Sequence, residues 1–442
     1  MKLGPLLLWL FLAAALSAAQ AVTAQGVPPF AREVVVADSS RDERFQAVAY
    51  NSTRGEALVV WSVDTGNGDT DLWARRARPE TPGLWVGAAF PVAATTAPES
   101  RAQVAFNPLD EDFLVVYERR LPSGDVDIIG QRVAGRAGAG DNGPELRGMP
   151  FAVAATILKE EQPDVAFLPA TQQFLVVYTL DDDVWAQRVA RYRLGDGGGE
   201  TIGSRFVVAA ELENAERAPT VAASLLRAYF LVAYAYEFEP NDFDVRGQRV
   251  HGMAVAGSQL LDEAFDIAFD SVSETEPRLA YNQVYQTFLA VWTATAGGQR
   301  DVRGVWLDDR IPTGSPLIGV SFAVSAGPVA EEWAPYPAID PSGGETAVAL
   351  NYAATTGSTP RLGLVWLQAR LPAPNPLAYP LALFPARPFP MLAPRLLLCP
   401  ARPCLLLGYN ARFGIEPNFE HDAHLLLGGR WSVALPLLRR GP

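Results

Sequence analysis

Residues 163–178 read PDVAFLPATQQFLVVY, and close relatives of this stretch recur along the chain. Two short runs of β-type residues, 165–168 and 174–178, flank a turn that contains Pro169. Apolar runs on both sides of a proline-containing turn are typical of a β-hairpin. The stretch therefore predicts a hairpin that forms the repeated core of the fold.

Seven copies of this hairpin can be aligned. They lie near residues 46–61, 102–117, 163–178, 219–234, 277–292, 337–352 and 394–409. Most copies are preceded by a Phe-x-Val-Ala run, at intervals of 55 to 61 residues, and most are followed by an Asp-x-x-Gly-Gln-Arg-Val run or a variant. Four β-runs in each of seven units predict an all-β fold, a seven-bladed β-propeller of four-stranded blades. A β-sandwich would not need this periodicity.

The C-terminal end indicates the order of strands within a blade. Gly428 and Gly429 lead directly from residues 423–427 into residues 431–434, a late copy of the Phe-x-Val-Ala run. A Gly-Gly pair between two β-runs favours a tight hairpin. The Phe-x-Val-Ala strand is therefore expected to be outermost in its blade, and the alanine-containing strand of the hairpin innermost. Residues 34–37 are then expected to complete the seventh blade, beside or in place of 431–434, within one propeller domain over residues 30–436.

Two copies of the Asp-x-x-Gly-Gln-Arg-Val run carry a family resemblance. Residues 130–133 and 247–250 both read GQRV, and they accompany runs of the type Pro-x-Val-Ala-Phe-Asn-Pro and Phe-Leu-Val-Val-Tyr. In these motifs the chain resembles the propeller-type repeats of uncharacterised bacterial secreted or surface proteins. The resemblance covers nearly all of the chain after the leader, although units six and seven lack the Gly-Gln-Arg part. It implies a propeller in an extracellular bacterial setting, and it transfers no active site.

The N-terminus predicts export. Lys2 is followed by an apolar run over residues 6–16 and by small residues as far as Ala24. This pattern is typical of a secretory signal peptide over residues 1–24, and the apolar run is too short to span a bilayer. An uncleaved anchor is the weaker alternative. We expect a secreted, extracellular or periplasmic monomer without a membrane span. The net charge of −13 argues against a nucleic-acid partner.

Cys399 and Cys404 are the whole cysteine inventory. In an exported chain a nearby pair predicts a disulfide, which here would join the two sides of the seventh hairpin. His421 and His424 follow about twenty residues later, so a zinc site of two cysteines and two histidines is an alternative. The disulfide is the favoured interpretation.

A glutamate stands three residues before the aligned start of most hairpins. These residues are Glu43, Glu99, Glu160, Glu216 and Glu274, with Glu332 slightly displaced in unit six. One hypothesis places them around one mouth of the central channel, where they would bind cations, a basic peptide or a polyol. The favoured alternative is a structural latch, in which each carboxylate pairs with an arginine or a loop N–H because the blade itself is repeated.

Calcium is the one cofactor that the sequence suggests, and only weakly. Asp64, Asn67, Asp69 and Asp71 place oxygen ligands at partly alternating positions. Their spacing does not match the EF-hand loop, and no bidentate glutamate follows. We therefore predict no cofactor and no other metal site.

Motifs of catalysis are missing from the sequence. The chain has three histidines, no Gly-x-Ser-x-Gly elbow and no His-Glu-x-x-His motif. The sequence thus favours a non-catalytic module that binds a protein or a glycan at one propeller face, or serves as a scaffold. The alternative is a carbohydrate-active hydrolase or lyase that uses a pair of carboxylates at the channel mouth.

Overall fold

The computed structural model describes residues 32–37, 39, 41–80, 83–193, 201–211, 214–255, 257–327, 329–367, 382–383, 391–399, 404–415 and 418–429. Two sequence predictions fall elsewhere. The signal peptide over residues 1–24 and the last outer run at 431–434 lie outside the described residues.

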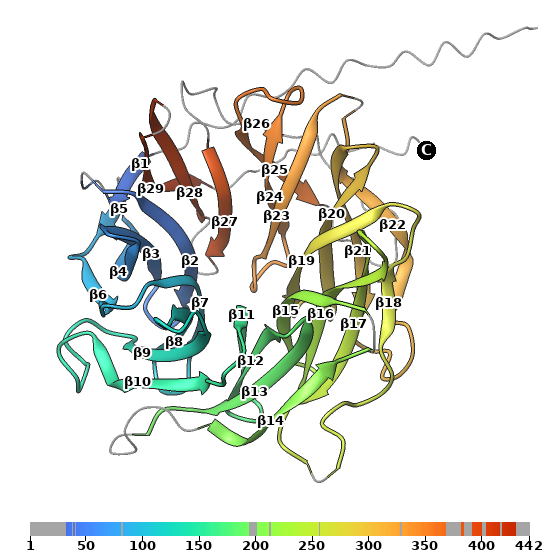
Figure 1. Cartoon of the computed structure of the whole chain (residues 1–442), viewed down its shortest axis with the longest axis horizontal. Coiled ribbons are helices and arrows are strands. Elements are labelled where there is room, and N and C mark those ends of the chain that lie inside the picture. Colours follow the sequence, from blue (N-terminus) through green and yellow to red (C-terminus); the bar gives the residue numbers. More distant parts are fainter. Residues whose placement is uncertain are drawn as a thin grey trace, which may run out of the picture.

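The strands form seven sheets, and in each sheet the strands follow one another in the same order from the inside to the outside. The innermost strands are β2 (Glu43–Asn51), β7 (Glu99–Asn107), β11 (Glu160–Leu168), β15 (Glu216–Ser224), β19 (Ser273–Asn282), β23 (Glu331–Ile339) and β27 (Met391–Cys399). The second strands are β3 (Glu56–Gly66), β8 (Asp112–Arg120), β12 (Gln173–Leu180), β16 (Tyr229–Glu239), β20 (Thr287–Ala296), β24 (Thr346–Ala353) and β28 (Cys404–Ile415). The inner strands surround the centre of the ring (Figure 1).

The third strands are β4 (Asp69–Glu80), β9 (Val126–Ala134), β13 (Asp183–Ala190), β17 (Asp242–His251), β21 (Gln299–Asp308), β25 (Arg361–Leu367) and β29 (Asn418–Gly429). The outer strands are β5 (Gly83–Val86) with β6 (Phe90–Ala93), β10 (Leu146–Ala154), β14 (Thr201–Ala209), β18 (Phe265–Ala268), β22 (Leu317–Ser325), β26 (Ala382–Leu383) and β1 (Arg32–Ala37). The all-β propeller of four-stranded blades is therefore confirmed, as is the strand order within a blade.

Six of the described sheets have four strands, and the sheet of β2 to β6 has five. The additional strand has a simple origin. In β10, β14 and β22 the pairing with the third strand shifts register in the middle of the outer strand. In the first sheet the same interruption separates β5 from β6, and both halves pair with β4. β26 is the shortest outer strand, with two residues.

The hairpin register corrects the sequence alignment of unit six. In blade three the register shift lies between Glu161 and Asp164, so Pro163 lies within the bulge. The corresponding shift in β23 lies between Trp333 and Tyr336, which gives Pro335 this position. The alignment on Pro337 was therefore displaced by two residues. Glu332 stands three residues before Pro335, in the regular repeat position.

The Phe-x-Val-Ala and Gly-Gln-Arg motifs recur together because the strands that carry them pair with each other. Phe151 lies opposite Gly130 in the register, and Phe265 lies opposite Gly247. A Cβ atom added at Gly130 would stand 2.6 Å from the ring of Phe151, and one at Gly247 would stand 2.7 Å from the ring of Phe265. The glycine therefore provides the space in which the phenylalanine ring of the outer strand lies.

β1 closes the ring. It pairs antiparallel with β29 and becomes the fourth strand of the sheet that contains β27 and β28. This confirms the prediction that residues 34–37 add an outer strand to the sheet of the last hairpin. Consecutive inner strands contact one another all the way round, and β27 contacts β2. Figure 1 shows the N-terminal and C-terminal strands side by side.

The hydrophobic core lies between the blades. Seven clusters of buried side chains are found among the described residues, and each combines side chains of two neighbouring sheets. One cluster joins Val36 of β1 and Leu425 of β29 to Phe45 and Val59 of the first sheet. Burial of apolar area at every junction is the main favourable term in such a fold. Within the described part of the chain we find no helix with the length and hydropathy to cross a membrane.

Candidate functional site

The six repeated glutamates lie at the junctions between blades. Glu43, Glu99, Glu160, Glu216, Glu274 and Glu332 stand at or next to the first residue of an inner strand. Their side chains are 0–4% exposed. None of them lines the central cavity that is described below. A buried position without access to the channel does not suit a cation-binding ring.

Most of these carboxylates are latches to the preceding loop. Glu43 accepts hydrogen bonds from the backbone N and the Oγ of Ser39 at 3.0 and 2.8 Å. Glu160 accepts one from Thr156 Oγ1 at 2.6 Å, and Glu216 accepts one from the backbone N of Glu211 at 3.1 Å. Equivalent bonds run from Thr95 to Glu99 and from Ser325 to Glu332. The latch partners are loop hydroxyl and N–H groups, and no arginine of the Gln-Arg strand is among these donors.

Five of the six latch glutamates also lie near an aspartate from the third strand of the preceding blade. The pairs are Glu99 with Asp71, Glu160 with Asp127, Glu216 with Asp183, Glu274 with Asp244, and Glu332 with Asp301. Two carboxyl groups in a buried site disfavour double ionisation. The arrangement can therefore hold a proton between two blades.

Burial is the largest cause of the raised pKa values of these glutamates, and the neighbouring carboxyl groups add to it. Burial, together with the charges of Asp270 and Asp244, raises the pKa of Glu274 to about 8. The pKa of Glu216 is raised to about 7 and that of Glu99 to about 6, again mainly by burial. The pKa of Asp244 is raised to about 6. At neutral pH the Glu274 carboxyl is therefore largely protonated.

The arginine of the Gln-Arg motif is a structural staple between blades. Arg132 is 1% exposed and forms a salt bridge to Asp112 at 3.0 Å. It also donates to the carbonyl of Ala190 in the next blade. Arg249 contacts Gly314 of the next blade in the same way, at 3.0 Å. Both guanidinium groups therefore make structural contacts between neighbouring blades.

The suggested calcium loop is the turn between β3 and β4. Gly66 N donates to Asp64 Oδ1 at 2.7 Å, and Thr65 Oγ1 donates to Asp69 Oδ2 at 2.9 Å. These bonds stabilise the turn itself, as aspartate side chains commonly do. In the part of the chain that the structure describes, no three histidine, cysteine, aspartate or glutamate side chains are grouped to hold a metal ion.

The cysteine pair lies where the sequence placed it. Cys399 ends β27, Cys404 begins β28, and the register makes them direct partners. Opposed residues of an antiparallel pair have Cα atoms about 4.5–5.5 Å apart, which is within the range of disulfides. Their side chains, and those of His421 and His424, lie outside the described side chains, so the disulfide stays a prediction.

A cavity of about 340 Å³ lies in the centre of the ring. All seven inner strands contribute to its lining. The lining residues are Gln46, Arg101, Gln103, Gln162, Pro163, Ala218, Pro219, Glu276, Arg278, Ala334, Pro335, Ala393 and Arg395. They come from the first part of each inner strand, so the cavity lies at the end of the channel where these strands begin. Its volume is in the usual range of small-molecule sites.

A bulge in each inner strand from β7 onward forms the wall of this cavity. The second residue after the latch position has a positive φ at six junctions, with Arg101 at 49°, Gln162 at 57° and Glu276 at 54° among them. This conformation is uncommon for residues other than glycine and is retained where the surrounding structure fixes it. All six of these residues line the cavity, and in β7, β19 and β27 the residue two positions later lines it as well.

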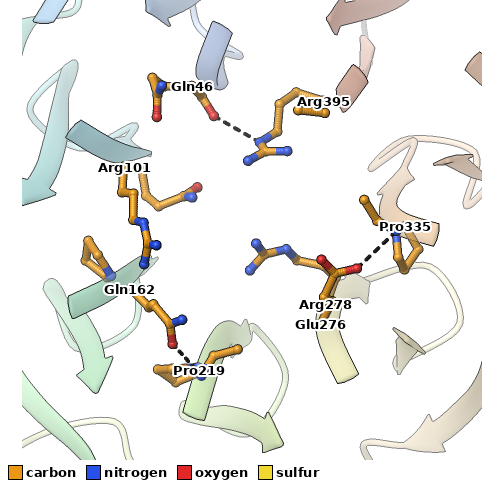
Figure 2. A pocket seen from close by; sticks show the side chains of 13 residues that line it. Gln46, Arg101, Gln162, Pro219, Glu276, Arg278, Pro335 and Arg395 are labelled. Atoms are coloured by element: carbon orange, nitrogen blue, oxygen red, sulfur yellow. Dashed lines mark hydrogen bonds between the residues drawn. The ribbon is translucent and has the colours of Figure 1, made fainter. Parts of the chain in front are cut away.

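Polar side chains connect the bulges of neighbouring blades. Gln162 Oε1 accepts a hydrogen bond from Ala218 N at 2.8 Å, and Glu276 Oε2 accepts one from Ala334 N at 3.2 Å. Both pairs are drawn in Figure 2. The wall of the cavity is thus fixed by side chains that span from one blade to the next.

Three guanidinium groups project into the cavity (Figure 2). Arg101 comes from β7, Arg278 from β19 and Arg395 from β27. Arg395 donates from Nε to the carbonyl of Gln46 at 2.9 Å and lies over the ring of Tyr336, 5.1 Å from its centroid. Burial, together with the charge of Arg278, lowers the pKa of Arg395 to about 10. Like charges therefore face each other in the channel.

These arginines are not among the site residues predicted from the sequence, although the repeats contain a signal for them. The cavity lining comes from the second, third and fourth positions after the latch position. The fourth-position residues are Ala47, Gln103, Asp164, Thr220, Arg278, Tyr336 and Arg395, of which Gln103, Arg278 and Arg395 line the cavity. In a repeat whose neighbouring positions are nearly uniform, a position that varies from blade to blade indicates a surface that does not serve the blade itself.

Comparisons with known proteins support no family assignment. No family model matches the chain, and no curated protein is similar to its sequence. Three similar solved structures cover 87–89% of this chain at TM-scores of 0.46 to 0.48. They are the propeller domain of Cps50 (Swd1) from Myceliophteria thermophila (11% identity, 99% of that chain covered), the intramolecular trans-sialidase from Ruminococcus gnavus (8%, 96%) and the NanB sialidase from Streptococcus pneumoniae (6%, 69%). At this level of similarity the function has to be argued from the site.

Proposed function

We propose that this chain is an exported, non-catalytic seven-bladed propeller that binds a protein or glycan ligand at one face, with each of the seven sheets as one blade. The binding site is the end of the channel where the inner strands begin. The central cavity supports this proposal, because every inner strand contributes to its lining and its polar side chains are held in place by their neighbours. A preorganised concave site with few polar groups is typical of ligand binding.

The enzyme alternative requires two carboxyl groups about 5 to 10 Å apart beside the ligand. Glu276 is the one carboxylate among the residues that line the cavity. Its Oε2 atom already accepts hydrogen bonds from Ala334 N and from Thr293 Oγ1, at 3.2 and 3.0 Å. The latch glutamates, which have raised pKa values, are buried between blades. These contacts favour binding over glycoside cleavage.

A channel-filling substitution tests the proposed site. Gln103 lines the cavity and is only partly exposed, so Gln103→Trp should occupy the space of the ligand. We expect the wild-type protein to bind at least one member of an array of neutral and acidic oligosaccharides and peptides, and the variant to lose that binding at least tenfold in isothermal titration calorimetry. The matched control is Gln283→Trp, because Gln283 lies in the turn at the opposite end of β19.

The same samples distinguish binding from catalysis. Incubation of a bound oligosaccharide with the wild-type protein should leave it intact, as followed by mass spectrometry. Cleavage that is lost in Glu276→Gln would establish the enzyme instead. Equal binding by wild type and Gln103→Trp would place the ligand elsewhere on the propeller.

A further inference from the structure

Two of the arginines in the central cavity have no carboxylate partner. Among the described residues, no aspartate or glutamate oxygen lies within salt-bridge distance of Arg278 or Arg395, whereas Arg101 lies 3.5 Å from Glu118. Arg395 is oriented by the carbonyls of Gln46 and Pro394. The charges of Asp164 and Glu276 act on Arg395 only through space, so two half-buried positive charges interact here without a direct ion pair, which is costly.

The nearest carboxylates are already occupied by other donors. Asp164 Oδ2 accepts from Thr220 Oγ1 at 2.8 Å and from Val221 N at 3.0 Å, although its charge acts on Arg278 through space. Glu276 holds the N–H of Ala334, as described above. The guanidinium group of Arg278 therefore points into the cavity with its hydrogen-bond donors available.

The remainder of the lining suits a hydroxylated molecule. Gln103 lines the cavity beside Arg101, and the amide NH₂ of Gln162 makes no hydrogen bond within the described residues, because only its Oε1 atom is engaged by Ala218 and Thr179. Pro163, Pro219 and Pro335 add apolar ring faces to the wall. Amide groups bind hydroxyls, and guanidinium groups bind oxyanions in a bidentate manner.

We propose that the cavity binds a sugar acid, free or as an acidic residue of a glycan, with its carboxylate on Arg278 and Arg395 and its hydroxyls on Gln103 and Gln162. This inference rests on the proposed function, because it names the ligand class of the same site. The protein carries a net charge of −13, so an anion is attracted here by the local guanidinium pair and not by the overall field.

The test compares D-galacturonate with D-galactose, which differ in the carboxylate at C6. Isothermal titration calorimetry on the full-length mature protein should show galacturonate binding at least tenfold more tightly than galactose, with weaker binding at higher salt. Arg278→Gln should weaken galacturonate binding at least tenfold and so remove this preference. Arg278→Lys should keep only part of the preference, because lysine lacks the bidentate fork of arginine. The control is Arg310→Gln, an exposed arginine that pairs with Asp308.

The melting temperature of the Arg278→Gln variant without ligand shows whether a loss of binding reflects loss of the site or unfolding of the protein. Removing one of two facing positive charges should leave the melting temperature of Arg278→Gln unchanged or raised, while the shift induced by galacturonate disappears. Oligogalacturonate that binds more tightly than the monosaccharide identifies a glycan as the source of the acid. Equal affinity for galacturonate and galactose, or undiminished galacturonate binding by Arg278→Gln, would overturn the sugar-acid inference. In that case, loss of neutral-sugar or peptide binding in Gln103→Trp would still support the proposed function.

Discussion

Glu274 illustrates how a single residue can be conspicuous in the sequence and yet have a role that the sequence does not reveal. It stands at the latch position, and its side chain is fully buried. Neither of its carboxyl oxygens accepts a hydrogen bond of ordinary geometry within the described part of the chain, and Asp244 of the preceding blade lies nearby. A carboxyl group in this setting is stabilised in its neutral form.

The protonated carboxyls predict a stability that falls as pH rises. The pKa of Glu274 is about 8 and that of Glu216 about 7 in the folded protein, against an ordinary value of 4.5. Between these values the folded protein holds protons that the unfolded chain releases, so the stabilisation is complete below about pH 4.5 and is lost as pH rises through 7 and 8. We expect the melting temperature to be several degrees lower at pH 9 than at pH 5, as measured by calorimetry.

Glu274→Gln provides the specific check, because glutamine resembles the protonated acid. This variant should lose less stability than the wild type between pH 5 and pH 9. Glu80→Gln, at an exposed ion pair with Arg78, is the matched control and should keep the wild-type profile. If the melting temperature of Glu274→Gln depended on pH in the same way as that of the wild type, Glu274 would not be protonated in the folded protein.

At the scale of the strands, the Gln-Arg motif serves the blade and its neighbour. Gln131 Nε2 donates to carbonyls at the register shift of the outer strand, including Arg147 O at 3.3 Å. Arg132 holds Asp112 and reaches the next blade, and its guanidinium also lies 5.4 Å from the ring centroid of Phe174. This explains why the motif recurs although it does not line the central cavity.

Loss of one staple should therefore destabilise two blades. Arg132→Met removes the partner of Asp112, which is fully buried, and an uncompensated buried charge costs about 3–5 kcal/mol. Urea unfolding should show this loss, and the additional substitution Asp112→Asn should recover part of it. The exposed control Arg310→Met should change the unfolding free energy by no more than about 0.5 kcal/mol. If Arg132→Met matched this control, the staple would have no energetic role.

At the scale of the whole molecule, a ring of blades depends on its closure. Every blade packs on two neighbours, and the junction between the last and the first blade includes β1 from the N-terminal end of the chain. The pairing of β1 with β29 also covers a strand edge that would otherwise be open to other chains. Closure therefore couples the two ends of the sequence to the stability of all blades.

Two neighbouring valines of β1 test this closure. Val36 is fully buried in the closing cluster, and Val35 on the opposite face of the strand is 36% exposed. Val36→Ala removes two buried carbon atoms, so it should lower the unfolding free energy by about 2 kcal/mol. Val35→Ala should cost no more than about 0.5 kcal/mol. Equal effects of the two substitutions in urea unfolding would argue against closure by β1.

The sequence by itself determined the repeated hairpin, the order of strands in a blade and the strand that completes the last blade. These features depend on local patterns, such as the apolar runs beside Pro169 and the pairing of Phe151 with Gly130, and repetition makes each pattern visible several times. It also marked the latch glutamates and favoured their structural role.

The central cavity, in contrast, was decided by the tertiary structure. Arg278 and Arg395 are 117 residues apart and belong to non-adjacent blades, so only the closed ring brings their charges together. Contacts across the centre depend on the number of blades and on the bulges that turn side chains inward, and no local pattern encodes them.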